Sequence, residues 1–136
     1  MVLFPAKTRY RKHQRRRLRG KASAGATVNF GEYGLQSMEC AYLTTNQIES
    51  ARKAMTHYLK RGGKVWVRVL ADRVRTERAA ETRMGGGKGA PIAFVAPVRQ
   101  GHILFEIGGT NEDSAKQALK LAGFKLPIKT RFVVKQ

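Results

Sequence analysis

The side chains that usually carry acid–base, nucleophilic or metal chemistry are few and scattered in this sequence. Of its 136 residues, 9 are Asp or Glu, 3 are His, and Cys40 is the single cysteine. One cysteine cannot form a disulfide within the chain or build a four-cysteine zinc site, and the histidines lack HExxH spacing. The acids show no cluster suited to paired-carboxylate chemistry. We therefore expect no catalytic residues, no metal site and no cofactor, and a protein that is not an enzyme.

Basic side chains dominate instead. The chain has 27 Lys and Arg residues, a formal net charge of +18 and a sequence pI near 11.0. Such charge destabilises a compact state unless a polyanion neutralises it, and nucleic acid is the first candidate. An anionic membrane surface is the second, but the sequence has no apolar run of about 18 residues. Residues 7–21 hold only Tyr10 and Leu18 as sizeable apolar anchors, so we expect no membrane partner.

The basic charge is concentrated at the N-terminus, where residues 1–21 hold nine bases and no acid. These bases are Lys7, Arg9, Arg11, Lys12, Arg15, Arg16, Arg17, Arg19 and Lys21. Dense like charge does not fold alone and becomes ordered on a phosphate backbone. Tyr10 among them could stack on an exposed base. We predict an extended basic arm over residues 1–24 that binds RNA; a solvated tail and a removable targeting segment remain alternatives.

A glycine-rich loop is predicted at residues 83–91, where four glycines surround Lys88. A P-loop would need glycine and a hydroxyl residue where Thr82 and Gly89 stand. A dinucleotide-binding turn would need a helix afterwards, but Pro91 and a strand-like run follow. The segment is therefore interpreted as a cationic finger whose glycines permit close approach to a nucleic-acid backbone. An idle surface loop is the alternative.

These segments must be positioned by a domain that we expect to be α+β, single and compact over residues 25–136, with two helices and a mixed sheet or barrel-like core. Thr44 and Gln47 form a capping box for a first helix ending near Arg61, and Thr110 is the expected N-cap of a second ending at Gly123. Alternation predicts strands at residues 27–30, 35–43, 64–70 and 128–134, a hairpin of 92–98 with 102–107, and leaves 74–83 open as a further strand.

The role of one face of the first helix and of one face of the strand 64–70 stays open at this point. On the first helix, Lys53 and Lys60 lie opposite the apolar stripe, on a face that is either solvated or in contact with RNA. On the strand 64–70, Trp66 shares a face with Lys64 and Arg68. We favour a core position for Trp66 over an RNA-stacking one.

Several runs of residues carry a family resemblance. They are Pro5–Lys12, Phe30–Leu35, Gln47–Thr56, Arg61–Arg68, Glu81–Gly89 and Lys125–Thr130. In this order they resemble the universal large-subunit ribosomal protein L-sixteen family, of bacterial or organellar type, over nearly the whole chain. The sequence departs from the family at Leu70–Val74 and Ile92–Phe94, where two prolines and a tryptophan are missing.

The resemblance implies a structural role in the large ribosomal subunit of a cytoplasmic or organellar ribosome. It implies binding to 23S-type rRNA near the peptidyl-transferase centre, contact with A-site tRNA, and neighbouring large-subunit proteins rather than a second copy of the chain. Contact with P-site tRNA stays open. In this family the basic start belongs to the mature protein, which argues against a targeting segment. Charge alone supports an alternative, a DNA-compacting protein without sequence preference.

Two sets of residues are candidates for these contacts. The rRNA-binding set comprises Tyr10, the nine bases of the arm, and Arg52, Lys53, Lys60, Arg61, Lys64 and Arg68. The tRNA-proximal loop comprises Arg83, Met84, Gly85, Gly86, Gly87, Lys88 and Gly89. By resemblance, Arg83 matches an arginine that some bacteria hydroxylate.

Overall fold

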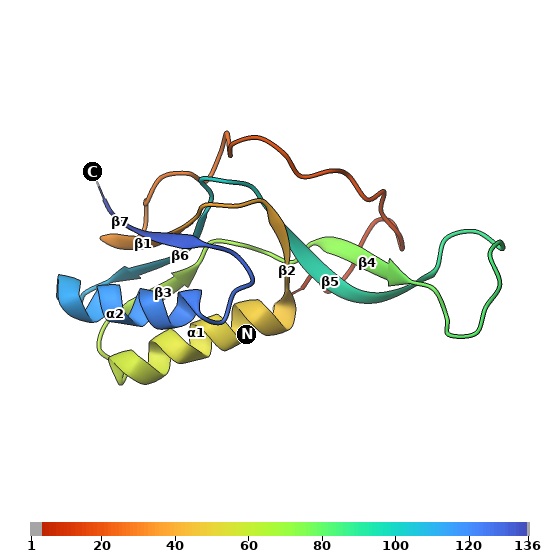
Figure 1. The fold of residues 1–136 in the computed structure, drawn as a ribbon. Coiled ribbons are helices and arrows are strands. Elements are labelled where there is room, and N and C mark those ends of the chain that lie inside the picture. Colours follow the sequence, from red (N-terminus) through yellow and green to blue (C-terminus); the bar gives the residue numbers. More distant parts are fainter. Residues whose placement is uncertain (1–3, 136) are drawn as a thin grey trace.

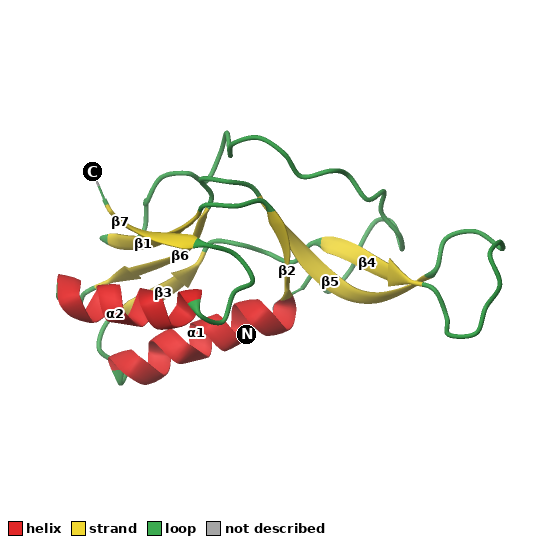
Figure 2. Cartoon of the chain, in the orientation of Figure 1, coloured by secondary structure: helices red, strands yellow, loops and turns green. Residues whose placement is uncertain are grey.

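Seven strands and two helices make up the part of the chain described by the computed structural model, residues 4–135. Residues 1–3 of the predicted arm and Gln136 lie outside the described residues. The elements are β1 (Tyr33–Ser37), β2 (Ala41–Thr44), α1 (Thr45–Leu59), β3 (Lys64–Val67), β4 (Arg73–Glu77), β5 (Ala90–Val98), β6 (Ile103–Gly108), α2 (Glu112–Gly123) and β7 (Thr130–Val134). Figure 2 shows two long irregular segments, the one that precedes β1 and the β4–β5 connection.

The strands form two antiparallel sheets. One has the order β3-β6-β1-β7 and the other the order β2-β5-β4. Both helices pack against each other and against one face of the four-stranded sheet (Figure 1). The three-stranded sheet extends away from this body and carries the β4–β5 connection at its far end (Figure 1). The predicted α+β class, single domain and two helices are confirmed.

The core lies between the helices and the four-stranded sheet. Ile48, Met55 and Leu119 supply the helix side, and Phe105 and Ile107 of β6 supply the sheet side. The helix residues recur at helical spacing, and the two β6 residues are two positions apart, as one face of a strand requires. β6 is the most deeply buried strand, because all six of its residues are buried.

The helix boundaries agree closely with the sequence. α1 begins with the predicted capping box, in which Gln47 N donates to Thr44 Oγ1 (3.3 Å) and Thr44 N donates to Gln47 Oε1 (3.0 Å). The N-cap of α2 is Asn111 rather than Thr110, and its side chain makes no capping bond. Two acids in the first turn, Glu112 and Asp113, complement the helix dipole there instead.

Three predictions of strand organisation are wrong. The run 35–43 is split at Met38–Cys40, because the chain leaves one sheet at β1 and enters the other at β2. Residues 92–98 and 102–107 do not pair as a hairpin, because β5 and β6 likewise belong to different sheets. Residues 27–30 are not a strand: this segment crosses the face of the four-stranded sheet that the helices leave open, where Val28 packs close to Gly34.

Candidate nucleic-acid interface

The predicted arm lies along the three-stranded sheet. All nine of its bases are exposed, and both backbone and side-chain groups of the arm contact the domain. Tyr42 Oη donates to the carbonyl of Arg16 (2.6 Å), and Val74 N donates to His13 Nδ1 (3.3 Å). At the end of the arm, Ala22 N donates to the carbonyl of Gln100 (2.8 Å). The charged groups of the arm are therefore exposed, although the Lys12 ammonium is also engaged by the loop.

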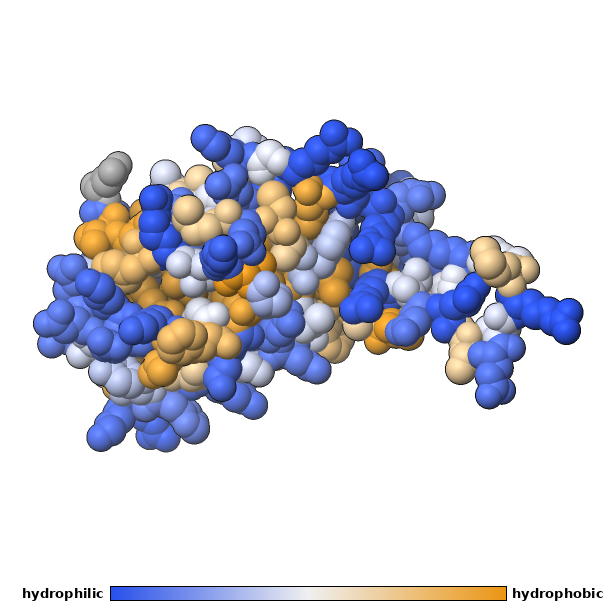
Figure 3. All heavy atoms as spheres, in the orientation of Figure 1, coloured by the Kyte–Doolittle hydropathy of each residue, from blue (hydrophilic) through white to orange (hydrophobic). Residues whose placement is uncertain are grey.

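The arm also contacts the glycine-rich loop, although the two segments are more than 70 residues apart in sequence. Lys12 Nζ donates to the carbonyl of Lys88 (2.7 Å), and Lys88 Nζ donates to the carbonyl of His13. These reciprocal bonds join the two candidate segments into one basic surface. Figure 3 shows hydrophilic side chains gathered along the arm at the upper edge, and hydrophilic residues between neutral and mildly hydrophobic ones on the projecting loop.

A cavity of about 690 Å³ lies between the arm and the three-stranded sheet. Its charged lining is entirely basic among the described residues: Arg15, Arg16, Arg17, Arg73, Arg75, Lys88 and Arg99. Converging cations without carboxylates attract a polyanion and release its counterions on binding. The arm–loop surface is therefore suited to a phosphate backbone.

The β4–β5 connection covers residues 78–89, so it begins before residue 83, and Ala90 and Pro91 already belong to β5. Arg83 and Lys88 are exposed, and Met84 is 90% exposed. Gly85, Gly86 and Gly87 have φ values of 128°, 73° and 88°, and a Cβ on any of them would meet nothing within 4 Å. These glycines are needed for backbone conformation and leave room for a ligand to approach the backbone closely.

The remaining candidates lie elsewhere. Lys60 and Arg61 follow the end of α1, and Lys64 begins β3, so these three exposed cations lie at the end of the body opposite the loop (Figure 1). Lys53 is exposed on α1, but Arg52 forms a paired contact with Glu49, from Nε to Oε2 at 2.9 Å. The predicted residues therefore form two separated basic regions rather than one.

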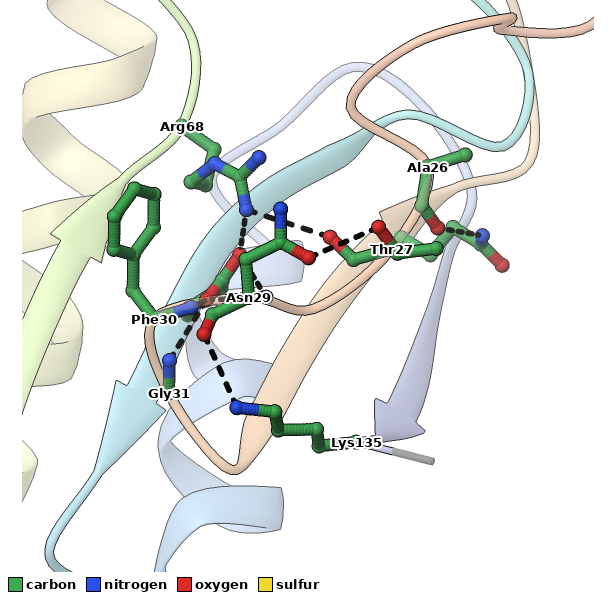
Figure 4. Close-up of polar contacts among 9 residues, drawn as sticks. Ala26, Thr27, Asn29, Phe30, Gly31, Arg68 and Lys135 are labelled. Atoms are coloured by element: carbon green, nitrogen blue, oxygen red, sulfur yellow. Dashed lines mark hydrogen bonds and ion pairs between the residues drawn. The ribbon is translucent and has the colours of Figure 1, made fainter.

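Arg68 has an internal partner that the sequence did not reveal. Its guanidinium forms an ion pair with Glu106, whose side chain is fully buried. The same carboxylate accepts backbone N–H bonds from Asn29 (3.2 Å), Phe30 (2.6 Å) and Gly31 (2.8 Å). Figure 4 shows residues 29–31 and the guanidinium of Arg68, which directly follows β3, converging on one point. The only signal in the sequence is that Glu106 stands alone as an acid within an apolar run. Strand alternation by itself does not tell whether such an acid is buried or exposed.

The protonation state of Glu106 follows from these contacts. Burial raises the pKa of its carboxyl, but the backbone bonds from Gly31, Phe30 and Asn29, with the bond from Arg68, outweigh burial and hold the pKa below its usual value. Glu106 therefore stays ionised at neutral pH and fixes residues 29–31 against the sheet. We call this arrangement the Glu106 clamp.

Metal-binding and membrane-spanning features are not found in the part of the chain that the structure describes. Within residues 4–135, no three His, Cys, Asp or Glu side chains gather in a way that could hold a metal ion. No helix between these same limits is long and apolar enough to cross a membrane.

A small α+β domain with an exposed basic arm, a glycine-rich cationic loop and a cavity lined by arginines defines a nucleic-acid-binding protein. Residues 5–133 match the family model described as ribosomal protein L16p/L10e. The chain belongs to this family, which confirms the resemblance inferred from the sequence. It is a ribosomal protein and not an enzyme.

Curated relatives of this chain are similar to it over nearly their whole length. The chain is 55% identical over 135 residues to the large ribosomal subunit protein uL16 of Trichodesmium erythraeum, covering 99% of this chain and 98% of that protein. It is 54% identical over 135 residues to the large ribosomal subunit protein uL16c of Gracilaria tenuistipitata, covering 99% and 100%. The uL16c protein of Porphyra purpurea is 54% identical over 134 residues, covering 98% and 96%.

Proposed function

We propose that this protein is a structural constituent of the large ribosomal subunit, where it binds 23S-type rRNA near the peptidyl-transferase centre. The full-length similarity to proteins of that subunit supports its assignment to the large subunit. The exposed bases of the arm supply phosphate contacts, because Arg and Lys neutralise the backbone without reading sequence. Its partners are rRNA and neighbouring large-subunit proteins, and it acts as a single copy in bacterial or organellar ribosomes.

The glycine-rich loop is proposed to contact the acceptor region of A-site tRNA, and that of P-site tRNA where the two lie close. The loop extends beyond the body of the protein, and Arg83 and Lys88 on it are exposed (Figure 1). A Cβ at any of residues 85–87 would meet nothing within 4 Å, which leaves room for an RNA backbone to approach there. The loop positions tRNA and takes no part in bond chemistry.

The observation that carries the proposal is the pair of bonds between arm and loop, Lys12 to Lys88 and Lys88 to His13. Because the two segments meet, an rRNA strand that follows the arm leads directly to the base of the loop. One continuous basic path then connects the rRNA-binding and tRNA-contacting regions.

Sedimentation after gentle lysis tests this function. The protein is expected to co-sediment with large subunits and to leave them after a high-salt wash or ribonuclease digestion, because phosphate contacts weaken with salt. Crosslinking then identifies the bound polymer as large-subunit rRNA. Sedimentation as a free protein in low salt, or crosslinks to DNA alone, would contradict the proposal.

A further inference from the structure

A second surface feature lies away from the arm and the loop. It is a shallow hollow of about 480 Å³ with Phe30 and Trp66 among its lining residues. Phe30 is 61% exposed, and its ring stacks on that of Trp66 with centroids 6.5 Å apart and planes inclined by 23°. Trp66 is half-buried and lies outside the main core, on the face of β3 away from the helices. Two aromatic rings at the surface, neither needed by the core, form a stacking platform.

The platform is held rigid from below by the Glu106 clamp. Three successive amides, those of Asn29, Phe30 and Gly31, donate to the buried carboxylate. A Cβ on Gly31 would lie 2.5 Å from the carbonyl oxygen of Ile107, so the segment sits directly on β6. The side chain of Phe30 is thereby directed outward before any ligand arrives, which lowers the ordering cost of binding.

The charges around the hollow select an anion. Lys64 and Lys135 line it, with Lys64 Nζ 5.2 Å from the centroid of the Trp66 ring. The guanidinium of Arg68 lies 5.0 Å from the centroid of the Phe30 ring, but Glu106 neutralises its charge, so the free positive charge comes from the two lysines. Among the described lining residues Glu32 is the one acid, and it can accept a bond from an exocyclic amine. Aromatic faces beside lysines match a nucleotide, whose base stacks and whose phosphates pair with cations.

We propose that the Phe30–Trp66 hollow binds one unpaired RNA base, with Lys64 and Lys135 contacting the phosphates that flank it. This proposal rests on the proposed RNA-binding function and deepens it, because it adds a contact to a base at the end of the body opposite the loop. A nucleotide within a helix keeps its base stacked and cannot enter the hollow, so the site requires single-stranded rRNA.

The single tryptophan of the chain makes the proposal directly measurable. Trp66 is that residue, so intrinsic tryptophan fluorescence reports on the hollow alone. A short single-stranded oligoadenylate is expected to quench it by stacking. An RNA duplex of equal charge is expected to bind through the arm, seen by anisotropy of a labelled duplex, without quenching.

Phe30→Leu tests the platform, and Phe124→Leu is the matched control, because Phe124 is 71% exposed at the end of α2. Phe30→Leu is expected to weaken oligoadenylate binding measured by quenching roughly 5- to 30-fold, the effect of removing one stacking ring. Phe124→Leu is expected to leave it unchanged. Urea midpoints of both variants establish that each is folded.

Three results would overturn the proposal: equal quenching by the duplex, no quenching by an oligoadenylate that binds, or no greater weakening for Phe30→Leu than for Phe124→Leu. The failures of the two proposals are distinguishable. If both RNAs bind by anisotropy but leave Trp66 fluorescence unchanged, the hollow is not a base site and RNA binding stands. If neither RNA binds, the RNA-binding function itself is contradicted.

Discussion

The loop 78–89 and the segment 26–31 are both irregular, yet they are held in opposite ways. Around residues 85–87 a Cβ would meet nothing within 4 Å, whereas at Gly31 it would collide with the backbone of Ile107. The segment 26–31 is fixed by a buried carboxylate, and the loop is fixed at its base by two lysine contacts with the arm. The loop is thus left open around its glycines, as its proposed contact with tRNA requires, whereas the segment 26–31 is packed into the fold.

The largest expected effect is at the centre of the clamp. Glu106→Ala is expected to lower the free energy of unfolding by about 3–5 kcal/mol, because it leaves Arg68 and three amides without their buried partner. Urea denaturation measures the decrease. Glu112→Ala, an acid in the exposed first turn of α2, is the control and is expected to cost less than about 1 kcal/mol. Equal decreases would show that the clamp is not stabilising.

A matched pair of glycine substitutions compares the two regions directly. Gly31→Ala is expected to cost about 2–3 kcal/mol, because the added methyl group forces the segment away from β6. Gly86→Ala is expected to cost less than about 1 kcal/mol: its φ of 73° disfavours alanine, but the open loop can relax. Thermal or urea unfolding of both variants shows which substitution lowers the free energy of unfolding more. A larger decrease for Gly86→Ala than for Gly31→Ala would contradict the difference between the two regions.

Acid should weaken the segment 26–31 before it affects the loop. The pKa of Glu106 is lowered in the folded state, so its contribution is complete above the unfolded value of about 4.3 and is lost as the pH falls through the folded value. Burial, and secondly the charge of Arg68, also lowers the pKa of His102, which adds a decrease in stability below about pH 6.5. Stability should therefore fall with decreasing pH, by at most about 1.4 kcal/mol per unit for each proton.

Urea midpoints measured between pH 3 and pH 7 test this dependence. The ionic strength is kept the same at every pH, because salt screens the charge interactions. Glu106→Gln removes the carboxyl that titrates at low pH, so the dependence of stability on pH should become flatter below about pH 4.3. A wild-type midpoint that stays constant down to pH 3, or a profile unchanged by Glu106→Gln, would show that this carboxylate is not linked to folding.

The smallest expected effect on stability is in the loop. Replacing Arg83 and Lys88 together by Gln is expected to change the free energy of unfolding by less than about 1 kcal/mol, because both are exposed and the bond from Lys88 to the carbonyl of His13 lies at the surface. The same variant is expected to impair tRNA accommodation or subunit maturation, measured by translation with purified ribosomes. Normal translation by such ribosomes would contradict the role proposed for the loop.

The sequence predicted the features that depend on local order along the chain. The capping box at Thr44 and Gln47, the cationic arm and the glycine-rich loop were visible because neighbouring residues define each of them. The family resemblance, which rests on runs of residues, was visible for the same reason. The two helices therefore followed from capping and periodicity without any knowledge of tertiary contacts.

The features that depend on pairing between distant residues were not predictable. β5 and β6 follow each other in the chain but belong to different sheets, and local alternation carries no information about sheet membership. Residues 27–30 alternate like a strand, but the amides of Asn29 and Phe30 bond to a carboxylate more than 75 positions away instead of to a neighbouring strand. Arg68 was predicted to contact rRNA, but its guanidinium pairs with the buried Glu106, a residue 38 positions away that the local sequence does not connect to it.

The salt dependence of binding to a large-subunit rRNA fragment tests most directly whether the arm is the main phosphate-binding region. The measurement compares the intact chain with a variant in which Arg15, Arg16, Arg17 and Arg19, all exposed, are replaced by Gln. We expect the slope of log affinity against log salt to become shallower by about 0.7–0.9 for each phosphate that the variant no longer neutralises, while the urea midpoint stays close to that of the wild type. An unchanged slope would show that the arm does not bind the RNA backbone.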